Sequence, residues 1–136
     1  MNVFDHAIQK ADIWIGEMMR ELGTDDARHA YRALSASLHA LRDRLSVDEA
    51  AQLGAQLPLL VRGLFYECWH PAATPVHVRR AEELLLLVEQ KAGEGGKLDP
   101  ERAVAATFEV LRRHVSPGQL ASLARVLPQG LAQLAR

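Results

Sequence analysis

The chain carries one helical pattern twice, at a constant offset that aligns position 41 with position 111. Residues 41–65 read LRDRLSVDEAAQLGAQLPLLVRGLF and residues 111–135 read LRRHVSPGQLASLARVLPQGLAQLA, and the two align without a gap. Each copy of such a unit has an apolar face that it cannot bury alone, so we expect the copies to bury these faces against each other. The identical pairs are Leu41 and Leu111, Arg42 and Arg112, Ser46 and Ser116, Ala51 and Ala121, Leu53 and Leu123, Leu57 and Leu127, Pro58 and Pro128, and Leu64 and Leu134.

The composition favours a single all-α domain over residues 1–136, made of repeats 1–70 and 71–136. A chain of 136 residues can bury enough surface for a stable core. Leu and Ala, which are strong helix formers, dominate the sequence, and β-branched residues are scarce. We therefore predict a tandem duplication of a four-helix unit, with about eight helices packed as one pseudo-symmetric bundle around the first, second, fifth and sixth helices.

Four helices are expected in the first repeat. Apolar residues recur at steps of three and four between Val3 and Leu22, which predicts one amphipathic helix there. A second helix is predicted to begin at a Thr24 cap. Ser46 and Glu49 form a capping-box pattern that opens a short third helix. Proline is tolerated in a first turn, so a fourth helix is expected from Pro58 to Trp69.

The second repeat follows the same scheme. Thr74 is expected to cap a fifth helix that begins at Pro75, and Asp99 to open the sixth. Ser116 repeats the capping-box serine, and Pro128 is expected to start an eighth helix. Within the fifth helix, the run Leu84–Leu87 covers every side, which is typical of a helix in an interior. We expect this run to lie between the repeats or in a subunit interface.

Charge and hydropathy limit the classes of partner. The formal net charge of −1 disfavours a nucleic-acid partner, because neutralising phosphates requires a basic surface. The N-terminal segment is charged where a signal peptide would be apolar, and the longest apolar run, Leu84–Val88, is too short to span a bilayer. The chain has a single cysteine, which suits a reducing compartment. These features predict a cytoplasmic protein without a membrane span.

One stretch of the first repeat has a recognisable pattern. Residues 39–72 read HALRDRLSVDEAAQLGAQLPLLVRGLFYECWHPA, and they resemble the family called domain of unknown function 2267, a group of uncharacterised bacterial proteins. The weaker copy at 103–134 fits this pattern too. The resemblance implies a helical fold and a bacterial origin, and it implies no reaction; Cys68 stands where the family pattern leads us to expect a small residue such as glycine. The matching residues are His39, Leu41, Arg42, Arg44, Leu45, Glu49, Ala50, Leu57, Pro58, Trp69, Pro71 and Ala72.

A basic cluster gives the first candidate binding site. His39, Arg42 and Arg44 lie at the end of the second helix, and Arg112 repeats Arg42 in the second copy. This cluster could bind an anion, an acidic partner or a lipid headgroup. The alternative, which we favour, is structural: arginines at helix ends interact with free carbonyl groups and with nearby acidic residues, and this explains them without a ligand.

Two tryptophans are further candidates for binding. Trp14 lies beside the main stripe of the first helix, where it widens the buried face or forms a patch for a partner. Trp69 ends an aromatic segment that has no counterpart in the second repeat and that is expected to fill the seam between the repeats. Cys68 and His70 could bind a metal, but a structural zinc site needs four ligands, and we expect Cys68 to be a core residue.

These observations predict a non-enzymatic protein-interaction module. The sequence shows neither a nucleophile with its base nor a metal-ligand pattern, so we predict no catalytic residue, no metal and no cofactor. The partner would be another protein or a second copy of the chain. The alternative is a small-ligand or lipid-binding protein, with an apolar cavity between the repeats and Arg42 or Arg112 holding an acidic headgroup.

Overall fold

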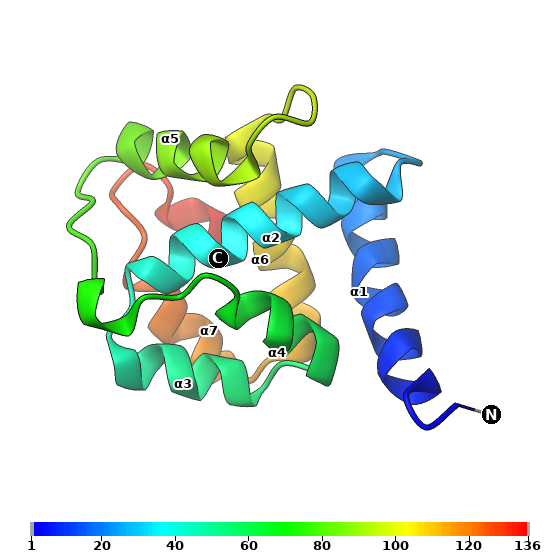
Figure 1. The fold of residues 1–136 in the computed structure, drawn as a ribbon. Coiled ribbons are helices and arrows are strands. Elements are labelled where there is room, and N and C mark those ends of the chain that lie inside the picture. Colours follow the sequence, from blue (N-terminus) through cyan, green and yellow to red (C-terminus); the bar gives the residue numbers. More distant parts are fainter. Residues whose placement is uncertain (1, 136) are drawn as a thin grey trace.

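The computed structural model describes residues 2–135, and all regular secondary structure in that range is helical (Figure 1). It contains seven α-helices and two short 3-10 helices within these residues, and no strand. In chain order they are α1 (Asp5–Leu22), α2 (Ala27–Asp43), α3 (Val47–Ala55), α4 (Leu59–Tyr66), η1 (Pro71–Ala73), α5 (Ala81–Ala92), α6 (Pro100–His114), α7 (Pro117–Ala124) and η2 (Ala132–Ala135).

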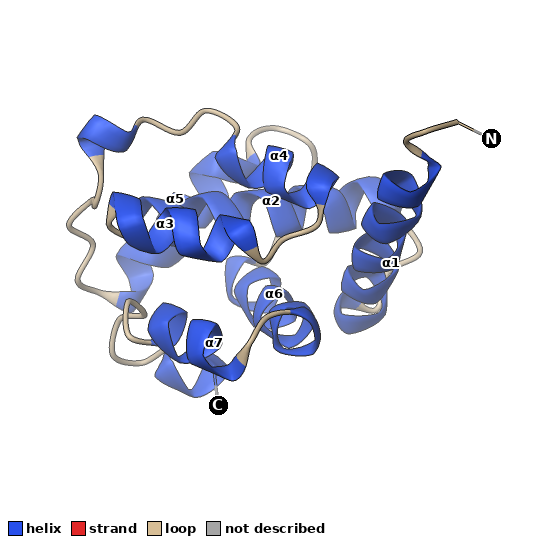
Figure 2. Cartoon of the chain, turned by 90° about the horizontal axis from the view of Figure 1, so that it is seen from below, coloured by secondary structure: helices blue, strands red, loops and turns tan. Residues whose placement is uncertain are grey.

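Helices α2 and α6 cross at the centre of the molecule (Figure 1), and α1 and α5 each contact both of them. Helices α3 and α7 contact each other on the lower face (Figure 2). The most deeply buried large apolar side chains, including Trp14, Met18, Phe65 and Phe108, come from α1, α4 and α6, with leucines from most of the other helices. The core therefore joins both halves of the chain, and no helix between residues 2 and 135 combines the length and apolar character that crossing a membrane requires.

Local capping explains most of the helix starts. Ser46 accepts a hydrogen bond from the Glu49 amide, and the Glu49 side chain accepts one from the Ser46 amide, so the predicted capping box is confirmed. The predicted Thr24 cap is wrong: Asp26 caps α2, because its side chain accepts from the amides of residues 28 and 29. Thr24 instead accepts a hydrogen bond from the Asp26 amide just before the helix.

Two predicted helices of the second repeat are shorter or absent. Helix α5 begins at Ala81 and not at Pro75, since residues 74–79 form an irregular linker after η1. The Val76 amide in this linker donates to the Asp43 carbonyl at 2.7 Å, which ties the linker to the end of α2. The eighth helix expected from Pro128 is also wrong, because the chain forms only a turn there, followed by η2.

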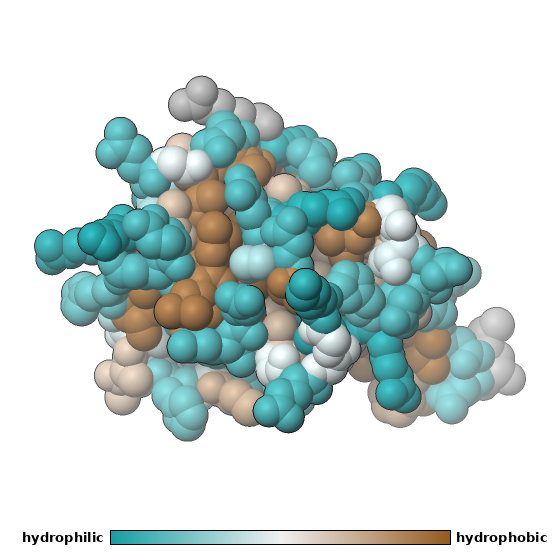
Figure 3. Space-filling view, turned by 90° about the horizontal axis from the view of Figure 1, so that it is seen from above, coloured by the Kyte–Doolittle hydropathy of each residue, from teal (hydrophilic) through white to brown (hydrophobic). Residues whose placement is uncertain are grey.

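The leucine run of α5 is not buried on all sides. Leu84 is buried, whereas Leu86 is 54% exposed. On the side of the molecule where α5 lies, apolar surface is visible between polar groups (Figure 3). One helix can turn only one face toward α2 and α6, so consecutive leucines cannot all reach the core of a single chain. The run therefore does not lie wholly between the two halves of this chain, and its placement in a subunit interface stays a prediction.

Several apolar residues that align between residues 41–65 and 111–135 lie in similar environments. Leu41 and Leu111 are both buried, as are Leu53 and Leu123. Arg42 differs from its counterpart: its side chain is 1% exposed, while that of Arg112 is 31% exposed. The aligned leucines are therefore buried in both halves, whereas the aligned arginines differ in exposure.

A second pair of arginines, which the sequence analysis missed, joins the halves reciprocally. Arg32 of α2 donates from Nε to the Ala92 carbonyl at the end of α5 (3.4 Å). Arg102, which occupies the corresponding position in α6, donates from Nη2 to the Leu22 carbonyl at the end of α1 (2.8 Å). Leu22 and Ala92 also occupy corresponding positions of the two repeats. Each half therefore supplies an arginine that satisfies a free carbonyl at a helix end in the other half.

Candidate functional site

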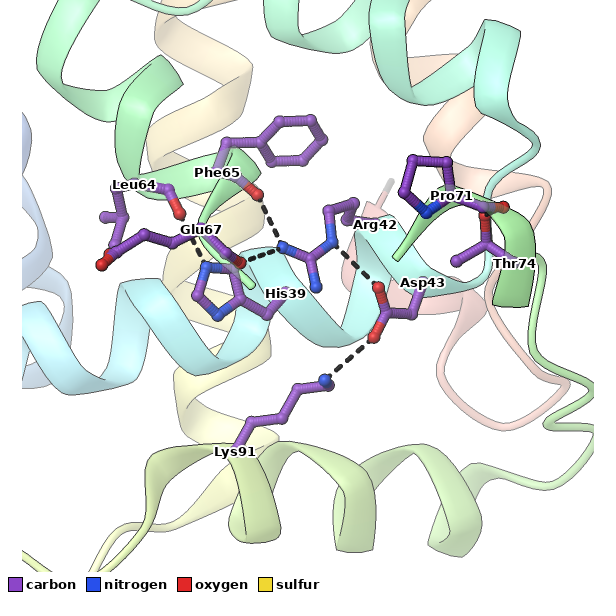
Figure 4. Close-up of polar contacts among 9 residues, drawn as sticks. All are labelled: His39, Arg42, Asp43, Leu64, Phe65, Glu67, Pro71, Thr74 and Lys91. Carbon is purple, nitrogen blue, oxygen red and sulfur yellow. Dashed lines mark hydrogen bonds and ion pairs between the residues drawn. The ribbon is translucent and has the colours of Figure 1, made fainter. Parts of the chain in front are cut away.

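Arg42 is buried and its guanidinium is engaged in the fold (Figure 4). Its Nη1 donates to the carbonyls of Phe65 (2.9 Å) and Glu67 (2.7 Å), at the end of α4. Its Nε donates to Asp43 Oδ1 at 2.9 Å. The last carbonyls of a helix have no partner within that helix, so Arg42 satisfies the end of α4 from the neighbouring α2.

His39 supports the same helix end. Its Nε2 lies 2.7 Å from the Leu64 carbonyl oxygen, which can only accept, so Nε2 carries the proton. Burial lowers the pKa of His39, and the hydrogen bond to Leu64 opposes this effect. His39 and Arg42 therefore form one polar contact between α2 and the C-terminal end of α4 (Figure 4).

Asp43 extends this contact to α5. Its Oδ2 lies 2.9 Å from Lys91 Nζ, while Oδ1 accepts from Arg42. Burial alone would raise the pKa of Asp43, but the hydrogen bonds from Arg42 and Lys91 outweigh burial and hold the pKa below its ordinary value. The cluster His39, Arg42, Asp43 and Lys91 thus joins α2, α4 and α5.

The other two basic residues of the predicted cluster lie apart from Arg42. Arg44 Nε donates to the Val126 carbonyl just after α7, so it connects the two halves of the chain. Burial lowers the pKa of Arg44. Arg112 lies on α6, with Nη2 3.7 Å from Glu109 Oε1. The structure therefore brings His39 and Arg42 together, and places Arg44 and Arg112 at other contacts.

Trp14 is buried, with 1% of its surface exposed, so the patch interpretation does not fit its position. Its ring stacks on the His114 ring with centroids 4.8 Å apart. His114 Nε2 lies 2.7 Å from Glu17 Oε1, and Arg113 pairs with Glu17 and Glu21. This second polar cluster holds α1 against the end of α6.

Trp69 is half-buried and packs on Tyr66, with ring centroids 5.2 Å apart. Tyr66 lies over Gly54 of α3, where a side chain would collide with its hydroxyl. This part of the aromatic segment therefore packs within the first half. For Trp69 and Tyr66, the expectation that the aromatic segment fills the seam between the repeats is therefore wrong.

Cys68 occupies a turn after α4 and is exposed, so the prediction of a core cysteine is wrong. The Trp69 amide donates to the Tyr66 carbonyl at 3.2 Å, Glu67 has φ −56° and ψ 133°, and Cys68 has φ 58°. These are the features of a type II turn, whose third residue needs positive φ and favours glycine. This turn explains in physical terms why a glycine suits position 68.

Replacing Cys68 by glycine is expected to stabilise the protein by about 1 kcal/mol, because glycine adopts positive φ without the steric cost that other residues incur. Denaturant unfolding of the two proteins would measure this difference. Cys68→Ala is the matched control and should give no gain, because alanine keeps the Cβ. An equal gain from alanine and glycine would show that the thiol, and not the backbone, is unfavourable.

An apolar groove, which we call the α1–α4 groove, lies between α1, α2 and α4, and it was not predicted from the sequence. It has a volume of about 290 Å³ and its residues all come from the first half of the chain. Leu34 and Val61 form a buried base, while Leu60 at the rim is 47% exposed. The groove is lined by Ala11, Ile15, Tyr31, Leu34, Leu60, Val61, Leu64 and Glu67.

The apolar stripe of α1 continues beyond this groove. Phe4 and Ile8 precede Ala11 and Ile15 at helical spacing, and both are exposed. The N-terminal end of α1 lies at the edge of the molecule in both ribbon views (Figures 1 and 2). The groove and the stripe together form an apolar surface that no other part of residues 2–135 covers fully.

Two polar groups stand at the groove. Tyr31 is partly exposed, and burial and the nearby Glu67 carboxylate raise the pKa of its hydroxyl. Figure 4 shows the Glu67 side chain extending away from Arg42, whose hydrogen bond to Glu67 goes to the backbone carbonyl. In contrast, residues 2–135 contain no group of three or more His, Cys, Asp or Glu arranged to hold a metal ion.

The chain matches a family model over most of its length. A model described as "Uncharacterized conserved protein (DUF2267)" matches residues 11–134. The chain belongs to the DUF2267 family. A comparison with curated proteins finds no match. The DUF2267 match includes the Arg42 cluster and every residue that lines the apolar groove, while Phe4 and Ile8 precede the matched range.

Proposed function

We propose that this DUF2267 protein is a non-enzymatic interaction module, built from two copies of one helical unit, that binds an apolar helical segment of another protein in the α1–α4 groove. The observation that carries the proposal is the groove itself. It has a buried apolar base, an exposed apolar rim and a continuing apolar stripe along α1. Amphipathic helices bind in grooves of this kind through residues spaced three and four apart.

The matching contacts of two arginines support the duplication, because chance would not place such a pair at corresponding positions. Arg32 and Arg102, at corresponding positions of the two repeats, each satisfy a helix end of the opposite half.

A comparison of the two repeats accounts for the open groove in the first half. In the second half, the equivalents of Ala11 and Leu60 are Ala81 and Gly130. A methyl group added at Gly130 would lie 3.6 Å from Ala81 Cβ, so the backbone there packs against α5 and leaves less space.

The basic residues support a structural role better than a binding role. Arg42 directs three hydrogen bonds to protein atoms and is buried. Trp14 is buried as well. Binding through His39, Arg44, Arg112 or Trp69 stays a prediction, and none of these residues lines the apolar groove.

Small-ligand binding is the second candidate function. The groove offers a site for such a ligand, but not at the place expected from the sequence. The groove lies within the first half, whereas the sequence analysis placed a cavity between the repeats. Its volume of about 290 Å³ suits a small apolar molecule. Native mass spectrometry of freshly purified protein distinguishes the candidates, because a bound small molecule adds a discrete mass.

The proposed function can be tested with a synthetic peptide of about four helical turns that has leucines on one face and glutamines elsewhere. We expect this peptide to bind, and Leu60→Ser to weaken binding by about tenfold, because a leucine that becomes buried on binding contributes about 1.5 kcal/mol. Calorimetric titration would measure the affinities.

Leu86→Ser is the matched control. Leu86 is exposed to a similar degree, 54% against 47% for Leu60, but it lies on α5 away from the groove. Its replacement should leave the affinity unchanged. Equal losses in the two variants, or no binding by the wild-type protein, would contradict the proposal. A co-purifying small molecule lost in Leu60→Ser would establish the second candidate instead.

A further inference from the structure

We propose that the partner segment is basic: an amphipathic helix whose lysine or arginine side chains meet an acidic rim around the α1–α4 groove. This inference rests on the proposed function and adds the chemical class of the partner. Its basis is the placement of three carboxylates, those of Asp5, Asp12 and Glu67, on the borders of one apolar surface.

Glu67 marks one border of this surface. It lines the groove beside Leu60 and Leu64, and its own side chain is exposed. Among residues 2–135, none forms an ion pair with its carboxylate. Tyr31, the second polar group, lines the same groove, and the Glu67 charge contributes to raising the pKa of its hydroxyl.

Asp5 and Asp12 mark the other border. They lie three positions before and four positions after Ile8, so all three share one face of α1. They line a shallow depression on α1 together with Ile8, Gln9 and His6. Within the described residues neither aspartate forms an ion pair, and His6 is the basic group of this depression. The exposed apolar stripe therefore runs between carboxylates on both sides.

This arrangement argues against a second copy of the chain as the occupant. In an antiparallel pair of α1 helices, each edge meets the same edge of its partner, so Asp5 and Asp12 would face their own counterparts. Like charges brought together across an interface oppose binding, whereas a basic segment would find a complementary charge at each border. The stripe from Phe4 to Ile15 spans about 16 Å, which suits about three turns of a partner helix.

Three peptides with the same leucine face test the inference, with glutamine, lysine or glutamate at the polar positions. We expect the lysine peptide to bind about tenfold more tightly than the glutamine peptide, and the glutamate peptide more weakly than either. The preference for lysine should fall severalfold in Glu67→Gln and in Asp12→Asn, and at about 0.5 M salt. Glu89→Gln, on α5, is the matched control and should keep the preference.

The outcomes separate the two proposals. Equal affinities for the three peptides would overturn the acidic rim and leave the groove as a binding site. Lysine-peptide binding that Leu60→Ser does not weaken would overturn it too, since the charge attraction would then be unrelated to the groove. Failure of all three peptides to bind contradicts the proposed function itself. A mass that doubles with concentration and reverts in Ile8→Ser would identify a second copy as the occupant and overturn the basic partner.

Discussion

Arg42→Ala is expected to lower the free energy of unfolding by about 3–5 kcal/mol and the melting temperature by at least about 10 °C. The substitution removes three hydrogen bonds and leaves the carbonyls of Phe65 and Glu67 without this donor. It also leaves Asp43 with Lys91 as its remaining cationic partner. Chemical and thermal denaturation would measure the loss.

Arg112→Ala is the matched control, because Arg112 occupies the equivalent position in the second repeat. Its side chain is 31% exposed and its ion pair with Glu109 is long, at 3.7 Å. This side chain is 31% exposed against 1% for Arg42, so this variant should lose clearly less stability than Arg42→Ala. If Arg42→Ala is too unstable to purify, Arg42→Lys should give an intermediate loss, since lysine keeps the charge without the planar fork. Equal stability of Arg42→Ala and Arg112→Ala would overturn the structural role of Arg42.

Trp14→Ala is expected to destabilise the protein by a similar amount, about 3–5 kcal/mol. Trp14 is the largest of the fully buried side chains, and its removal would leave a cavity between α1 and α6 and would expose one face of His114. The stacked pair would be lost together with the apolar burial. Thermal denaturation followed by circular dichroism would measure the change.

Ile13→Ala is the control for Trp14→Ala. Ile13 is the preceding residue of the same helix, and it is 45% exposed. Alanine is a good helix former, so this variant should change stability by less than about 1 kcal/mol. A large loss at Ile13 together with a small loss at Trp14 would mean that α1 presents a different face to the core.

Much of the fold could be predicted because its signals are local. The Ser46 capping box and the cap at Asp99 depend on residues within one turn, and the structure has both. One failure occurred where a local signal competed with a tertiary contact. A proline at position 75 can start a helix, but the Val76 amide bonds to the end of α2 and the chain stays irregular until Ala81.

The candidate site could be predicted only in part. The favoured explanation of Arg42, an arginine that satisfies helix carbonyls, agrees with its contacts, although those carbonyls belong to α4 and not to its own helix. Arg32 and Arg102 gave no signal in the aligned segments, because they precede the stretch in which the repeat is strongest. A search for charged residues paired at the offset of the repeat could have found them.

The amino-acid sequence by itself determined the helical class, the family, the positions of most helix ends and the repeated apolar faces. These properties depend on the periodicity and chemistry of neighbouring residues. Only the tertiary structure decided that Arg42 is buried while Arg112 is partly exposed, that Trp14 belongs to the core, and that one half keeps an open groove. Each of these depends on which distant helices pack against a residue, and a pattern that is the same in both repeats cannot distinguish the two surroundings.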